Sequence, residues 1–219
     1  MKLLHILSES DADAFFYERI AERVTGASFT PCDIRLRKGD GESKVRASIK
    51  LLLSKFPKNT PRPECALLLS LDNDRCPDHP GASAYPRVLT SAERRRASRW
   101  RIIQDAMLAR WGENRRAWPV DVAVAVPVEM IESWVLLLLN PERAPLPFHS
   151  LKTDRTAIAF HDPLPPGPQL KDLAADEARH RNLSKQELMM NAAECDLEAA
   201  GNVSTSFRLF LEDLRSWSI

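Results

Sequence analysis

Residues 65–74 read Cys-Ala-Leu-Leu-Leu-Ser-Leu-Asp-Asn-Asp, and this stretch decides the expected fold. It is apolar from residue 65 to residue 71 apart from Ser70, without the alternation of a strand that has one wet face. A continuous apolar run of this length is typical of a parallel strand covered on both sides. It ends directly in Asp72-Asn73-Asp74, so we expect carboxylates at the end of a buried strand.

Further strands and helices alternate on both sides of this stretch. Right-handed βαβ units follow from such alternation, so the sequence predicts an α/β fold: a mostly parallel, Rossmann-like sheet of about four strands flanked by helices. The predicted strands are 2–7, 29–36, 65–71 and 120–126, and the predicted helices are 12–24, 45–56, 91–111 and 130–139. Residues 75–89, rich in Pro, Gly and Ser, are expected to form a loop.

The pattern changes after residue 140. Prolines crowd residues 141–168, and helical stretches follow near 170–181, 185–193 and 204–217. We therefore expect an α/β core at 1–140, and a Pro-rich connection with a helical C-terminal extension, packed on the core, at 141–219.

Composition limits the class of protein. The chain has 219 residues, 44% of them hydrophobic, with a formal net charge of +1. Four cysteines lack any C-x-x-C pair, so a structural zinc site is not indicated. The opening run MKLLHILSES becomes polar too soon for a signal peptide or a spanning helix. We expect a cytoplasmic protein with no membrane partner.

Acidic residues follow three of the predicted strands. Carboxylates brought together at the ends of parallel strands repel one another unless a cation offsets their charge, and all-oxygen ligands suit Mg²⁺, or Mn²⁺ in its place. Turn formation and helix capping are the plainer explanations for each acid taken alone. The candidate metal-binding and catalytic residues are Glu9, Asp72, Asp74, Glu129 and Glu132.

Several of these residues lie in stretches that resemble a known family. Residues 4–9 (LHILSE) and 69–74 (LSLDND) resemble the Toprim pattern, in which Glu ends the first strand and Asp-x-Asp ends a later one. Together with 124–134 and 206–214, they look like the small uncharacterised Toprim-like proteins related to the overcoming-lysogenization-defect (OLD) nucleases. The resemblance spans nearly the whole chain.

This resemblance implies magnesium-dependent phosphodiester chemistry, often in bacterial defence against phage. Glu9 would be a metal ligand or a general acid/base, and Asp72 and Asp74 would bind metal. Glu129 and Glu132 match the acidic positions for a second ion. Ser10 stands where the Toprim pattern usually has Gly, and a side chain there would restrict the approach of a phosphate.

An arginine-rich segment follows the predicted loop. Guanidinium groups beside a metal site are suited to hold the phosphates next to the scissile one, although a long helix often has a charged, solvated face. The candidate nucleic-acid-binding residues are Arg94, Arg95, Arg96, Arg99 and Arg101.

The expected function is a Mg²⁺-dependent nuclease acting on DNA or RNA, with anti-phage defence as its expected role. The alternative is a non-catalytic Toprim-fold partner or sensor in a multi-protein defence system, which the Ser10 departure and the small size favour. Because no Walker sequence is present, an ATPase would be a separate partner chain. A small-molecule phosphatase with an aspartyl nucleophile ranks third, because no matching Lys follows the fourth strand.

Overall fold

The fold is described from a computed structural model. It describes residues 2–35, 42–58, 60–72, 98–127, 130–140 and 167–218. Its contacts divide the chain into two compact units. The first comprises residues 1–71, 99–125 and 210–219, and the second comprises 72–98 and 126–209.

The first unit is built on a four-stranded sheet. Its strands are β1 (Lys2–Ser8), β2 (Phe29–Arg35), β3 (Cys65–Ser70) and β4 (Asp121–Ala125). The order is β2-β1-β3-β4, and every neighbouring pair is parallel. The expected α/β class and parallel sheet are therefore confirmed.

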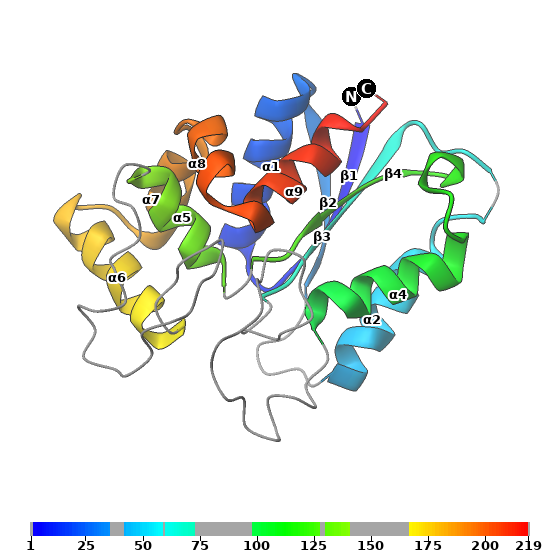
Figure 1. Ribbon diagram of the computed structural model, residues 1–219, viewed down its shortest axis with the longest axis horizontal. Coiled ribbons are helices and arrows are strands. Elements are labelled where there is room, and N and C mark those ends of the chain that lie inside the picture. The colour runs from blue at the N-terminus through cyan, green and yellow to red at the C-terminus, as the bar shows by residue number, and fades with distance from the viewer. Residues whose placement is uncertain are drawn as a thin grey trace. The chain divides into compact units, whose positions relative to one another are not determined.

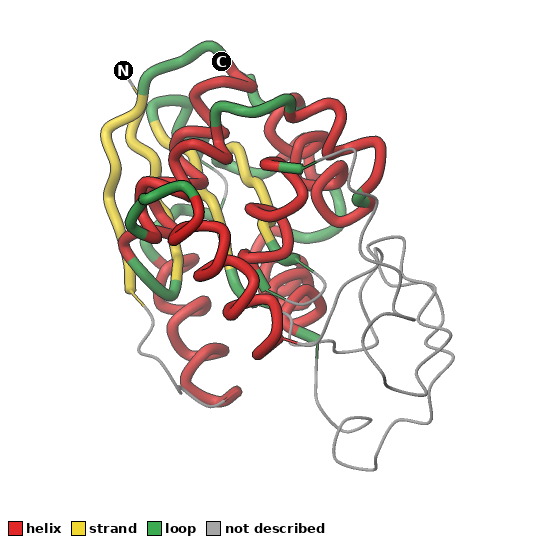
Figure 2. Tube along the Cα trace, turned by 90° about the vertical axis from the view of Figure 1, so that its left-hand side faces the viewer, coloured by secondary structure: helices red, strands yellow, loops and turns green. Residues whose placement is uncertain are grey.

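Helices cover both faces of this sheet. They are α1 (Asp11–Thr25), α2 (Glu42–Ser54) and α4 (Arg99–Trp111). Figure 1 shows α1 on one side of the strands and α2 with α4 on the other, and Figure 2 shows the strands lying side by side. All six residues of β3 are buried, as its apolar sequence predicts.

Local signals set the ends of α1. Ser10 is its N-cap, with an extended backbone (φ −149°) and a side-chain oxygen that accepts a hydrogen bond from the Asp13 N–H. Gly26 closes the helix in the left-handed conformation (φ 71°) and donates its N–H to the Glu22 carbonyl. The expected stop at Gly26 is confirmed.

The C-terminal end of the chain protects the exposed edge of the sheet. Helix α9 (Thr205–Arg215) crosses from the second unit into the first, where its Asp213 accepts a hydrogen bond from the Val124 N–H at 3.0 Å. Because β4 is an edge strand, its unpaired N–H groups could pair with a strand of another chain. The bond to Asp213 satisfies one of these donors. Arg115, in the 3₁₀ helix η1 (Arg115–Ala117), forms an ion pair with the same carboxylate at 3.0 Å.

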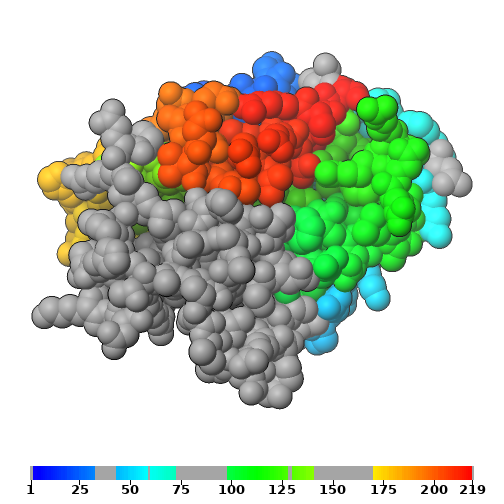
Figure 3. All heavy atoms as spheres, in the orientation of Figure 1, coloured from blue at the N-terminus to red at the C-terminus, as the bar shows by residue number. Residues whose placement is uncertain are grey.

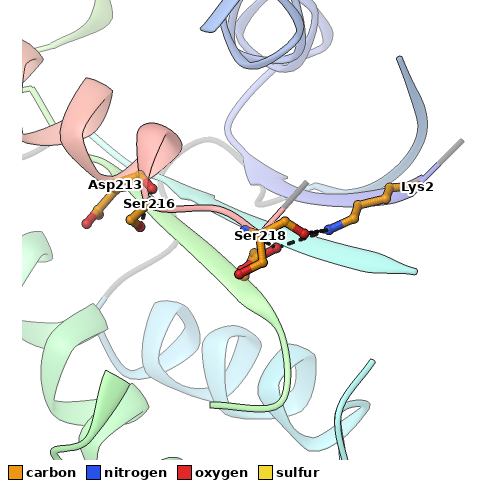
Figure 4. A network of polar contacts seen from close by, with 5 residues as sticks. Lys2, Asp213, Ser216 and Ser218 are labelled. Carbon is orange, nitrogen blue, oxygen red and sulfur yellow. Dashed lines mark hydrogen bonds and ion pairs between the residues drawn. The ribbon is translucent and has the colours of Figure 1, made fainter. Parts of the chain in front are cut away.

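A second polar network joins the two ends of the chain (Figure 4). Lys2 on β1 contacts the Asp121 carboxylate at 3.1 Å and donates to the Ser218 carbonyl at 3.0 Å. The Ser218 N–H donates to the same Asp121 carboxylate. These bonds fix the last residues against the amino ends of β1 and β4.

The described part of the second unit is mainly helical. It contains α5 (Ile131–Leu139), α6 (Gly167–His180), α7 (Lys185–Ala193) and α8 (Leu197–Val203). Helix α5 packs against the other three, and its buried Trp134 stacks edge-on against Phe207 at 5.1 Å. The Trp134 Nε1–H donates to the Ser206 hydroxyl, so the indole is satisfied inside the core.

The helical segments expected from the sequence are present, and most of their described boundaries are displaced by a few residues at most. The helix expected at 91–111 is the exception: it begins at Arg99, and Ser98 lies outside it, so the predicted start is wrong. The α7 boundaries are those predicted, and its Ser184–Glu187 capping box explains the sharp start. Helix α8 was missed, because seven residues containing Gly201 carry too little periodicity. The predicted loop at 75–89 lies outside the described residues, and the boundaries 1–140 and 141–219 stay predictions.

Among the described residues, no helix has both the length and the apolar character needed to cross a bilayer.

We expect His5 to make folding pH-dependent. Burial, and then the nearby Lys55 charge, lower the pKa of His5 below its ordinary value. The unfolded state therefore binds the proton more tightly, and this contribution to stability is lost as the pH falls through the lowered pKa. In urea unfolding between about pH 7.5 and about pH 5, His5→Gln should show a shallower loss of stability than the wild type. The exposed His180→Gln is the control, and equal slopes for all three proteins would contradict the assignment.

We expect Asp213 to act mainly as a hydrogen-bond acceptor. Asp213→Ala should lower the free energy of unfolding by about 2 kcal/mol because the Val124 N–H loses its partner, whereas Asp213→Asn keeps an acceptor and should cost less. Burial raises the pKa of Asp213, against the opposite effects of Arg115 and the Val124 N–H.

Because the folded protein then binds the proton more tightly, the stability supplied by Asp213 is lost as the pH rises through the raised pKa. Asp213→Asn should lack this loss between about pH 3 and about pH 6. If the free energy of unfolding changes with pH in the same way for the wild type and Asp213→Asn, the pKa shift of Asp213 has no effect on folding.

Candidate metal centre

The strand order places two of the predicted acids beyond neighbouring strand ends. β1 pairs with β3 in parallel, with Leu7 opposite Leu69, so their carboxyl ends lie at the same edge. Glu9 follows β1 directly, and Leu71, which donates its N–H to the Ala125 carbonyl, follows β3. Asp72 is the next residue along the chain. In open α/β sheets, ligands bind where the strand order reverses, and here it reverses between β1 and β3.

The turn after β1 exposes Glu9 and fixes the residues around it. Ser8 is fully buried and its hydroxyl donates to the Ser10 carbonyl at 3.1 Å. Ser10 has a backbone that any residue adopts, and its side chain caps α1. Ser10 therefore has a structural role at the start of α1. The Glu9 side chain itself is exposed.

In the second unit, Asp72 caps a helix that follows it by almost sixty residues. Its Oδ1 accepts the Ile131 N–H at 2.9 Å, at the first residue of α5. The N-cap residue of α5 is Met130, whose side chain makes no capping bond. The carboxylate supplies that bond, and its charge also suits the positive end of the helix dipole. Sequence patterns do not indicate this contact, because capping residues are sought next to the helix that they cap.

Glu132 lies one residue further along the same helix and is buried, with 5% of its surface exposed. Its Oε1 forms an ion pair with Lys185 Nζ at 3.0 Å, from the first residue of α7. Among the residues that the structure describes, Oε2 is buried and has no hydrogen-bond partner. The sequence missed Lys185 as the counter-charge because it is 53 residues away.

The five predicted acids are only partly described. Glu9 belongs to the first unit, and Asp72 and Glu132 belong to the second, where both lie at the start of α5. Asp74 and Glu129 lie outside the described residues. Within the described ranges, no group of three or more His, Cys, Asp or Glu side chains is arranged to hold a metal ion. The metal-ligand assignments stay predictions.

The predicted arginines are also divided. Arg99 and Arg101 begin α4, where Arg101 is exposed, and Arg94, Arg95 and Arg96 lie outside the described residues. Further along α4, Trp111 packs against Phe56 and Trp118. These indoles contribute to an aromatic cluster, which is the usual place of a tryptophan in a folded domain.

Comparison with protein-family models, with curated proteins and with solved structures found no match.

We expect the Glu132–Lys185 pair to show strong coupling. Lys185→Ala should destabilise the protein by about 2 kcal/mol, because it leaves a buried carboxylate unpaired. Glu132→Gln removes that charge, so the double variant should recover part of the loss. A double-mutant cycle by urea unfolding measures the coupling, and strictly additive effects would show that the pair does not stabilise the fold.

Proposed function

We propose that this chain is a Toprim-like, Mg²⁺-dependent nuclease that hydrolyses phosphodiester bonds in DNA or RNA. The observation that carries the proposal is the strand order β2-β1-β3-β4. It makes β1 and β3 neighbours, and Glu9 and Asp72 are the first acids after these two strands. We further propose that the protein acts in the cytoplasm, with an ATPase or another defence protein as a possible partner chain.

The residues present fit a hard metal ion. Glu9 is exposed in a turn held by Ser8 and Ser10, and a carboxylate is a suitable ligand for Mg²⁺. Asp72 Oδ1 caps α5, and a carboxylate has about four acceptor positions, so one carboxylate is able to cap a helix and also bind a metal ion. A bound ion would activate a water molecule and stabilise charge on the phosphate. Glu9 would act as a ligand or as the group that moves a proton.

The cap determines which Asp72 variant is informative. Asp72→Ala removes both the charge and the bond to the Ile131 N–H, so a loss of activity would have two explanations. Asp72→Asn keeps an oxygen acceptor for that N–H and removes only the negative charge. Glu9→Gln makes the same change at the end of β1.

We expect the wild type to cut labelled nucleic acid with Mg²⁺ or Mn²⁺ and not with chelator. Single-stranded and duplex DNA and RNA should all be tested. Glu9→Gln and Asp72→Asn should each lower the rate by about a hundredfold or more, because a metal ligand contributes several kcal/mol to the transition state.

Matched controls are Glu22→Gln on α1 and Asp176→Asn on α6, two acids paired with arginines of their own helices. Both controls should keep the wild-type rate. If folded wild-type protein binds Mg²⁺ by calorimetry but cuts no substrate, the nuclease proposal fails and the partner or sensor function replaces it. Cutting that survives in Glu9→Gln and Asp72→Asn would place the active centre elsewhere.

A further inference from the structure

Helix α2 and the turn after it carry a concentrated positive charge. Residues 42–58 contain five basic residues and one acidic residue, Glu42 at the start of the helix, although the whole chain has a net charge of only +1. The five are Lys44, Arg46, Lys50, Lys55 and Lys58. Such a local imbalance in a nearly neutral protein identifies a surface with a distinct electrostatic role.

The lysines lie on the outward side of the helix. Val45, Ile49, Leu52 and Leu53 are buried. At 100° per residue Lys44 and Lys50 lie on the two flanks of the opposite side, about 120° apart, and both side chains are exposed, as are Lys55 and Lys58 after the helix. We call the exposed Lys44, Lys50 and Lys55 the basic track. It is about 16 Å long from residue 44 to residue 55, at 1.5 Å per residue.

This face continues onto α4. The two helices pack side by side, and the Arg110 guanidinium donates to the Phe56 carbonyl at 2.6 Å. Figure 1 shows both helices beginning at the edge where the strands end, and Figure 3 shows α4 (green) with part of α2 (light blue) on the visible surface. Arg99 and Arg101 therefore begin α4 at the same edge as Lys44 on α2.

We propose that the outward face of α2, continued by the start of α4, binds the phosphate backbone of a nucleic acid. This inference rests on the proposed function, because the track begins at the edge of the sheet that carries Glu9. Lysines match phosphates as point charges and read no sequence, so the surface positions a nucleic acid without selecting its bases.

The composition of the face favours nucleic acid over a membrane. Leu51, 67% exposed, is the large apolar side chain on the outward side of α2, beside Ser43, Ala47 and Ser54. An interfacial helix needs a broad apolar face to enter a bilayer, which one leucine does not provide. Small side chains between lysines instead allow a phosphate backbone to approach closely.

Binding is measured separately from cutting, by fluorescence anisotropy of a labelled 20-base-pair duplex and a 20-nucleotide single strand in chelator. Lys50→Gln/Lys55→Gln should raise the Kd about tenfold on every sequence. For this double variant, the slope of the logarithm of the association constant against the logarithm of the salt concentration should be smaller in magnitude by about two. Each lost phosphate contact accounts for about one unit. Arg19→Gln/Arg23→Gln on α1, on the other face of the sheet, removes the same charge and should change the Kd less than twofold.

The outcomes separate this inference from the proposed function. Equal Kd values and salt slopes for the wild type and Lys50→Gln/Lys55→Gln would overturn the proposal that the basic track binds nucleic acid, even if the wild type cuts nucleic acid. Binding that depends on Lys50 and Lys55 would support the track even if no cutting occurs. Binding to phosphatidylserine vesicles without binding to any nucleic acid would overturn it in favour of a membrane surface. Urea unfolding confirms that the variants are folded.

Discussion

The parallel pairing of β1 with both β2 and β3 is the constraint on which the first unit depends. A strand paired on both sides has no free backbone donors, and the apolar residues of β1 and β3 require cover on both faces of the sheet. Parallel strands need crossover connections, which place helices on those faces. The sheet, its flanking helices and the edge where the strands end all follow from this pairing.

Carboxylates from distant parts of the chain accept hydrogen bonds from backbone N–H groups that the sheet and the helices leave without a partner. Asp213 satisfies a donor of the edge strand β4, and Asp72 satisfies the first N–H of α5. In both places a carboxylate meets a backbone N–H, and an unsatisfied buried donor costs more than a typical hydrogen bond contributes. An acid at a strand end is therefore not automatically a catalytic one. Asp72 follows a strand and has a structural role as the cap of α5.

Charge is distributed unevenly around the proposed site. Acids follow the ends of β1 and β3, and basic residues line α2 and the start of α4 on one face of the sheet. The basic residues suit the polyanion of the proposed function, because its phosphates would meet the opposite charge. The same arrangement serves a non-catalytic nucleic-acid sensor equally well, so turnover has to be measured directly.

The sequence by itself determined the four strands and most helices of the described part of this protein, because their signals are local. The apolar run at 65–71, the Ser10 and Gly26 caps and the Ser184–Glu187 capping box each lie within or beside the segment that they define. Only the tertiary structure decided the strand order, the capping of α5 by Asp72 and the pairing of Glu132 with Lys185. The two side-chain contacts join residues more than fifty positions apart. No periodicity or spacing in a single sequence records which distant groups meet when the chain folds.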